Sequence, residues 1–508
     1  MSSHGNDNGN EARSGPPGPG PAATTPPPPD ADTAPGAGDT PPGDRDAPPG
    51  AGRDAARIVA VRRFAAAARR WRGLRVTGCA VLLAVALSAG AVAVGGAREG
   101  AGAVPGGAPA GRPGAVRDAG PDVGIPALEA RLRAQPRDFE GWAALGLAHV
   151  ELARTDGDPS RYPRAERALK RSLELKPGND RALSGRAALA AARHDFAKAL
   201  AYADRALAAN PYNERALCSR VDALVELGRY DDAARAADTA DTRRPGVPVF
   251  TRYAYVRELR GETDTARKVL ERALAAASAP ADVAYVATQL GHLARRQGDR
   301  PAALRHYARA LAADDTYLPA LEGRARTRAA SGDRDGAVGD LERVVARAPL
   351  PGPLVALGEL YEVRGEPAKA REQYALVDAW TALARAGGVE AGLDTALAAA
   401  DHGDRKAALR AARAEWDRRR TVHTADAVAW ALHVNGLDRE ALPYARRAVA
   451  TGYRDAAFLY HLGVIERAVG RHGDARRHLS AALRLDPGFS PLGAREARRA
   501  LKELEAAR

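Results

Sequence analysis

The sequence lacks almost all of the patterns that mark catalytic and metal centres. It has no G-x-x-x-x-G-K-[ST] phosphate loop, no G-x-S-x-G nucleophile turn, no H-E-x-x-H helix and no C-x-x-C pair. Its two cysteines, Cys79 and Cys218, lie in segments of different character and are not expected to pair. We therefore expect neither an enzyme nor a cofactor or metal site, and cysteine usage leaves the cellular compartment open.

Long blocks of like charge are also scarce. The formal net charge is +13, but basic and acidic residues interleave through the larger, C-terminal part of the chain. A nucleic-acid partner is therefore not expected. The exception is residues 53–75, where eight arginines crowd into one stretch. Arginine is used far more often than lysine, which favours a bacterial source with a GC-rich genome.

The N-terminal quarter divides into segments of contrasting composition. Residues 1–52 are rich in proline and glycine and nearly free of large apolar groups, so we expect a disordered tail. Residues 76–97 carry no charge and would span roughly 33 Å as a helix, which is enough to cross a bilayer. Because the basic segment 53–75 precedes this span, the N-terminus is predicted to be cytoplasmic and the rest extracytoplasmic. Residues 98–123 are predicted to be a flexible linker.

Two processing alternatives concern the same apolar segment. The lipobox-like sequence ending at Cys79 is rejected, because its apolar stretch follows the cysteine instead of preceding it. Signal-peptidase sites of A-x-A type, such as Ala89-Gly90-Ala91, would release the remainder of the chain. A secreted protein therefore remains an open alternative to a single-pass membrane protein.

Beyond the linker, the chain is built on a repeat. Pro177, Pro211 and Pro245 are spaced 34 residues apart, which is typical of solenoids built from helix pairs. Turn glycines recur with nearly the same period: Gly228, Gly261, Gly298, Gly332, Gly365, Gly403, Gly436 and Gly470. Alanines follow each turn by five residues: Ala199, Ala233, Ala266, Ala303, Ala337, Ala370, Ala408, Ala441 and Ala475. We expect left-handed glycines at the turns, close helix packing at the alanines, and helix ends before the prolines.

The pattern resembles the tetratricopeptide repeat (TPR) family. Matching residues in three units are Trp142, Leu145, Gly146, Ala165 and Pro177; Leu357, Gly358, Tyr361, Ala370 and Tyr374; and Leu459, Leu462, Gly463, Ala475, Ala482 and Pro487. The resemblance covers about residues 138–487. It implies an all-α fold, a right-handed superhelix of about ten repeats over residues 124–490, with a capping helix at 491–508. The units starting near Gly388 and Val422 lack the L-G pair and the closing proline, and are either degenerate repeats or a break in the superhelix.

Two polar clusters are interpreted without a catalytic role. His461, His472 and His478, with Asp474, are expected to be solvated surface residues on different faces of a helix pair. The run Asp401-His402-Gly403-Asp404 is expected to be a turn between helices.

The TPR resemblance implies a concave groove lined by the first helix of each pair. Counted from the turn glycines, ten aromatic, histidine and arginine residues are candidates for binding a partner there: Tyr255, Tyr285, His292, Arg295, Arg296, Arg326, Trp430, His433, Tyr460 and Arg467. Aromatic residues and arginine dominate binding hot spots, although several of these residues could simply fill the superhelix interior. Acidic groove residues are Asp222, Glu226, Glu359 and Glu362, and the family's carboxylate clamp is not visible.

These features predict a non-enzymatic, membrane-tethered scaffold that binds a peptide or helix of an envelope protein. An accessory subunit of an envelope enzyme or transport complex is the main alternative. A cytoplasmic sensor would require the opposite membrane topology, and a self-association device would need no other partner. The sequence leaves the partner and the oligomeric state open.

Overall fold

The computed structural model describes residues 121–156, 159–386 and 392–506. The chain divides into two units, residues 1–51 and 52–508, and everything described here belongs to the second. Within these ranges the secondary structure is helical, without strands, which confirms the all-α expectation. None of the described helices is long and apolar enough to cross a membrane. The tail 1–52, the basic segment 53–75, the predicted span 76–97 and nearly all of the linker lie outside the described residues.

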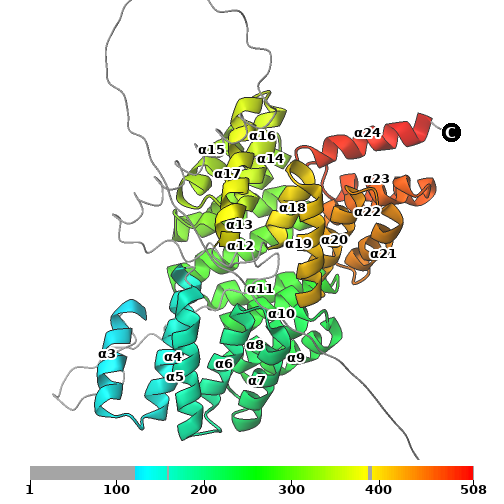
Figure 1. The fold of residues 1–508 in the computed structure, drawn as a ribbon. Coiled ribbons are helices and arrows are strands. Elements are labelled where there is room, and N and C mark those ends of the chain that lie inside the picture. The colour runs from blue at the N-terminus through cyan, green and yellow to red at the C-terminus, as the bar shows by residue number, and fades with distance from the viewer. Residues whose placement is uncertain (1–120, 157–158, 387–391, 507–508) are drawn as a thin grey trace, which may run out of the picture. The chain divides into compact units, whose positions relative to one another are not determined.

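Helix pairs follow one another through the described ranges (Figure 1). Each pair has a first and a second helix joined by a short connection, and successive pairs pack on each other. The pairs are α4 (Phe139–Asp156) with α5 (Tyr162–Leu175), α6 (Asp180–Ala192) with α7 (Phe196–Ala209), α8 (Glu214–Glu226) with α9 (Tyr230–Arg243), α10 (Val247–Leu259) with α11 (Thr263–Ala276), α12 (Pro280–Arg296) with α13 (Arg300–Ala313), α14 (Leu318–Ala330) with α15 (Arg334–Arg347), α16 (Pro351–Val363) with α17 (Pro367–Ala386), α18 (Leu393–His402) with α19 (Arg405–Arg418), α20 (Val422–His433) with α21 (Asp438–Val449), and α22 (Ala456–Ala468) with α23 (His472–Leu485).

Three further elements complete the description. Helix α3 (Pro121–Ala134) precedes the first pair, and α24 (Gly493–Ala506) follows the last. A short 3-10 helix, η2 (Pro159–Arg161), lies between α4 and α5. Helix α3 begins inside the range predicted as linker, so that boundary needs correction. The units near Gly388 and Val422, which lack the L-G pair, still form helix pairs.

The turn glycines adopt the predicted left-handed conformation at seven of the eight positions. Gly403 is the exception, because its φ of −142° is extended backbone that any residue can adopt. In the second pair the equivalent position is occupied by His194, with φ of 58°. A side chain other than glycine in this region is disfavoured by contact of its Cβ with the backbone. The turn conformation is therefore set by the helix-pair geometry rather than by glycine alone.

Close packing within each pair explains the small residues of the repeat. All nine predicted alanines are buried, with at most 1 % of their surface exposed. In the first helices a Cβ added to Gly146, Gly358 or Gly463 would lie 2.5–2.7 Å from a side chain of the second helix. The partners are Leu169, Tyr374 and Leu479 respectively. The glycine of the L-G pair is thus required because a large residue of the second helix packs directly on its Cα.

The predicted prolines follow the ends of second helices. Helices α5, α7 and α23 end two residues before Pro177, Pro211 and Pro487, and the intervening residue is extended in each case. This is the conformation that a following proline imposes.

The chain also contacts itself far beyond neighbouring repeats. The Arg420 amide donates to the Glu226 carbonyl over 2.9 Å, and the Val422 amide donates to the Tyr230 hydroxyl over 2.8 Å. A Cβ added to Gly261 or Gly298 would lie within 2.7 Å of the Gly452 or Leu485 carbonyl oxygen. The turns of α8–α13 therefore touch the connections that precede α20 and α22 and follow α23. We call this contact region the junction.

Candidate functional site

The first helices form one layer of the solenoid. Helices α4, α6, α8, α10, α12, α14, α16, α18, α20 and α22 each contact the next first helix as well as their own second helix. No contact of comparable extent joins successive second helices within the described ranges. The first helices are therefore the inner layer, which is the surface predicted to bind a partner.

All ten predicted groove residues lie on first helices. Tyr255 is on α10; Tyr285, His292, Arg295 and Arg296 are on α12; Arg326 is on α14; Trp430 and His433 are on α20; Tyr460 and Arg467 are on α22. Trp430 and Tyr460 are buried, with 8 % and 4 % of their surface exposed. The other eight are half-buried. In this conformation the two buried rings belong to the hydrophobic core, and the half-buried residues are the members that a partner can reach.

Two of the predicted groove residues on α12, Arg296 and His292, form hydrogen bonds within the chain. Arg296 donates two hydrogen bonds to Glu258, over 2.5 and 2.8 Å. His292 is hydrogen-bonded to the Tyr307 hydroxyl over 2.8 Å. Burial, with the nearby charge of Arg296, holds the pKa of His292 well below its ordinary value. This imidazole is therefore neutral at physiological pH and serves as a packed, hydrogen-bonded ring.

The α20–α22 part shows a different chemistry. The Trp430 indole donates to Asp401 Oδ1 over 2.6 Å and stacks on the His461 ring at 4.1 Å. The Tyr460 hydroxyl donates to Glu496 over 2.6 Å. Here aromatic side chains, rather than arginines, bond the carboxylates. At the edges of this region His433 is bonded to Asp438 over 2.5 Å, and Arg467 to Glu503 over 2.8 Å.

The four acidic groove residues divide between two environments. Asp222 accepts from the fully buried Arg252 over 3.0 Å, and Glu226 accepts from Arg419 over 2.6 Å. Both of these carboxylates therefore already form ion pairs within the chain. Glu359 and Glu362 lie on α16 and have no Arg or Lys in an ion pair within the described part of the chain.

The junction has an ionic and an apolar component. Arg419 bonds Glu226 and also Glu415, which is only 1 % exposed. Burial alone would lower the pKa of Arg419, but these two carboxylates outweigh it and raise the pKa further above its ordinary value. One hydrophobic cluster also joins Val221 and Val256 with Val422 and Tyr453.

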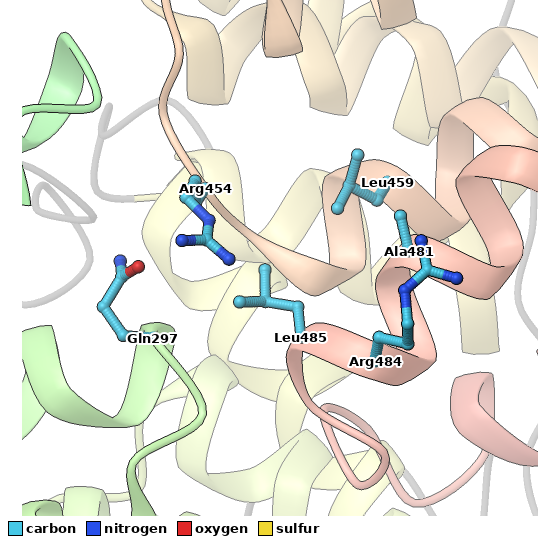
Figure 2. Close-up of a pocket in the computed structure, with 6 residues that line it drawn as sticks. All are labelled: Gln297, Arg454, Leu459, Ala481, Arg484 and Leu485. Atoms are coloured by element: carbon cyan, nitrogen blue, oxygen red, sulfur yellow. The ribbon is translucent and has the colours of Figure 1, made fainter.

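A small cavity of about 290 Å³ opens at the junction (Figure 2). Figure 2 shows Gln297 at the end of α12 and Arg454 before α22 on its wall, and the other lining residues are Leu459, Ala481, Arg484 and Leu485. Arg484 lies in the last turn of α23, where a basic side chain interacts favourably with the partial negative charge of the helix end.

Two sequence interpretations hold only in part. Gly403 and Asp404 connect α18 to α19 as expected, but Asp401 and His402 belong to the last turn of α18. His461 is bonded to Asp426 over 3.0 Å with 13 % of its side chain exposed, and His478 is bonded to Glu466 over 2.6 Å. These two histidines are therefore packed polar residues and not solvated surface. Asp401 lies on the first helix of the pair that precedes the pair of Trp430, 29 positions earlier in the chain.

Comparison with known proteins identifies the repeat. A tetratricopeptide repeat model matches residues 150–214 and 435–488. No curated protein matches the chain. Segments similar to tetratricopeptide repeats therefore lie in both the N-terminal and the C-terminal described parts.

Solved structures with a similar helix-pair arrangement come from several sources. PilW, a type IV pilus biogenesis factor, is 22% identical over 39% of this chain and 92% of its own, with a TM-score of 0.36. Pseudomonas aeruginosa PilF is 20% identical over 41% and 92%, with a TM-score of 0.34. A human IFIT1 dimer with m7Gppp-AAAA is 17% identical over 65% and 77%, with a TM-score of 0.43.

Proposed function

Because segments of the chain are similar to tetratricopeptide repeats, we propose that it is a non-enzymatic protein-interaction scaffold. The observation that carries this proposal is the inner layer of first helices, which continues from α4 to α22 and presents half-buried arginine, histidine and aromatic side chains. Side chains of these types supply most of the binding energy at protein interfaces. The described residues also hold no group of three or more His, Cys, Asp or Glu that could bind a metal ion.

We further propose that the scaffold is tethered to a bacterial membrane through residues 76–97 and binds a segment of an envelope partner. The uncharged stretch and the arginines before it support this topology. An accessory role in an envelope enzyme or transport complex would use the same surface, and cleavage at an A-x-A site would release a secreted form.

The groove proposal can be tested by site-specific photo-crosslinking in membranes of the native host. A photoreactive residue at Arg326 on α14, whose side chain is 38% exposed, is expected to form an adduct with one partner protein. The matched control is Arg343 on the second helix α15, with 53% exposure. Equal adducts at both positions, or none at Arg326, would contradict a groove. An adduct with a second copy of the chain would indicate self-association instead.

The tether can be tested by thiol labelling of whole cells. Cys79 and Cys218 are replaced, a single cysteine is placed at Arg508, and a membrane-impermeant maleimide is added. Label in the membrane fraction is expected. Label in the medium alone would indicate secretion, and label only after lysis would overturn the outward topology.

A further inference from the structure

Aromatic rings and carboxylates come together on the first helices α16, α18, α20 and α22 and on the adjoining helices α17 and α24. We call this set the acidic aromatic face, and its residues are Glu359, Glu362, Tyr374, Asp401, His402, Trp430, Tyr460, His461 and Glu496. Tyr374 stacks on His402 with ring centroids 4.1 Å apart and planes 12° from parallel. Trp430 stacks on His461 in the same way, at 4.1 Å and 18°.

The carboxylates of this face are bonded to aromatic side chains. Glu362 accepts from the Tyr374 hydroxyl over 3.0 Å, as Asp401 accepts from Trp430 and Glu496 from Tyr460. Glu359 lies 3.5 Å from His402 Nε2. Over the described ranges none of the four carboxylates forms an ion pair with Arg or Lys, although Lys and Arg outnumber Asp and Glu by 76 to 63 in the chain. The face therefore has unmatched negative charge in a basic protein.

The directions of two histidine pKa shifts agree with this sign. Burial alone would lower the pKa of His402, but Glu359 and Asp401 outweigh burial and raise it above the ordinary value. Burial likewise opposes the charge of His461, and Asp426 with Asp401 raises its pKa. The nearby arginines do not form ion pairs with these carboxylates. Arg326 forms its ion pair with Glu322 and interacts with Glu359 only through longer-range electrostatics. Arg499 on α24 interacts electrostatically with Tyr460, in the direction that lowers the pKa of its hydroxyl.

Most carboxylates of the acidic aromatic face are exposed to solvent. Glu362, Asp401 and Glu496 are exposed, whereas Trp430 and Tyr460 are buried beneath them. His402 Nε2 is shielded from solvent and has no hydrogen bond of normal geometry. The exposed carboxylates therefore lie next to stacked aromatic rings that are more deeply buried.

We propose that the acidic aromatic face binds an arginine side chain carried by a peptide segment of the partner protein. A guanidinium matches the carboxylates, because it bonds them through two parallel N–H groups, and the half-buried ring of Tyr374 is the aromatic side chain that its plane can reach. Lysine offers a point charge without the planar fork, so arginine is the preferred residue. This inference rests on the proposed scaffold function and names the chemistry of its partner.

The test uses the full-length protein in detergent micelles and fluorescence anisotropy at about 0.15 M salt, which screens non-specific attraction. The probe is a labelled, end-capped peptide of about ten residues that alternates arginine and alanine. Companion peptides carry lysine or glutamate in place of arginine. The variant is Glu362→Gln with Asp401→Asn. The control is Asp264→Asn with Asp417→Asn, which removes the same charge from two exposed residues outside the face.

The arginine peptide is expected to bind more tightly than the lysine peptide, and the glutamate peptide not at all. The Glu362→Gln/Asp401→Asn variant is expected to weaken binding by about tenfold or more, because two charge-assisted contacts are lost. The control is expected to stay within about twofold. Equal weakening by the control, or no binding of the arginine peptide at about 1 mM, would overturn the proposal.

Failure of this inference can be separated from failure of the scaffold function. If the Arg326 photo-adduct persists in the Glu362→Gln/Asp401→Asn variant while the arginine peptide does not bind, the groove still binds a partner but not through this face. If no adduct forms at Arg326 even in the protein whose acidic aromatic face is unchanged, the scaffold function itself fails.

Discussion

At the level of single residues, Arg419 connects parts of the chain that are 193 positions apart. Its guanidinium is 5% exposed and lies between Glu226 and Glu415. A buried ion pair adds little stability relative to a well-packed apolar pair, but loss of one member leaves the other charge buried and unmatched. Arg419 therefore matters most as the neutralising partner of two carboxylates.

Replacing Arg419 with alanine is expected to lower the free energy of unfolding by about 3–5 kcal/mol. Chemical denaturation measures the change. The control is Arg413→Ala on α19, the helix that ends just before Arg419. Both members of the Arg413–Glu440 pair are exposed, so it should contribute under about 1 kcal/mol. A similar small loss for both variants would show that the junction does not depend on this ion pair.

His423 makes stability depend on pH. Burial, with Arg419 and Arg296 nearby, lowers the pKa of His423 to about 3. The unfolded chain therefore takes up a proton near pH 6.5 while the folded chain does not, so stability is lost as pH falls below that value. Between pH 7.5 and 5.5 this single group should remove about 1.4 kcal/mol.

The His423→Phe variant isolates this contribution, because phenylalanine keeps a ring beside Tyr453 and Phe458. Its unfolding free energy is expected to fall less than that of the unmodified protein over the same pH range, by about 1.4 kcal/mol. Parallel pH curves for the two proteins would refute the prediction.

At the level of elements, the turns fall into two environments. Gly365 has φ of 76° with open space around it, whereas Gly298 has φ of 80° with the Leu485 carbonyl against it. Both turns need a left-handed residue, but only the second is also constrained by a distant part of the chain. The repeat pattern in the sequence is the same in both cases.

Substituting alanine at these two glycines separates the effects. Gly365→Ala is expected to cost about 1–2 kcal/mol through its backbone conformation alone. Gly298→Ala should cost about 1–3 kcal/mol more, because its Cβ would lie 2.1 Å from the Leu485 oxygen. Thermal unfolding of both variants gives the comparison. Equal losses of stability would mean that the Leu485 backbone shifts away from the added Cβ at little cost.

At the level of the described repeats as a whole, the junction changes how stability is distributed. A solenoid is normally stabilised by contacts between neighbouring repeats, so distant repeats open independently. Here the Arg419–Glu226 and Arg300–Asp486 pairs connect repeats 193 and 186 positions apart. Distant repeats are therefore expected to open together.

Hydrogen exchange can measure this coupling. In the unmodified protein, slowly exchanging amides in α10–α13 and α20–α23 are expected to share one opening free energy. In the combined Arg419→Ala/Gly298→Ala variant, α20–α23 should exchange earlier than α10–α13. Independent opening in the unmodified protein would contradict the coupling.

The candidate site was only partly accessible from sequence. Repeat phase placed all ten groove residues on first helices, because helical periodicity determines which face a residue occupies. It did not distinguish the buried Trp430 and Tyr460 from the half-buried Arg326, since burial depends on neighbours that are distant in sequence. Asp401 was expected in the turn between helices because the residue types of Asp401–Asp404 suit a turn, whereas it belongs to the last turn of α18.

The sequence by itself determined the helix pairs, since proline, glycine and alanine at fixed intervals act through local backbone geometry and close packing. Only the tertiary structure decided the junction and the acidic aromatic face. Both bring together residues from different repeats that carry no mark of their partners, such as Glu226 with Arg419 and Asp401 with Trp430. Their proximity depends on small rotations between successive repeats, which accumulate over the solenoid and are not encoded at any one position.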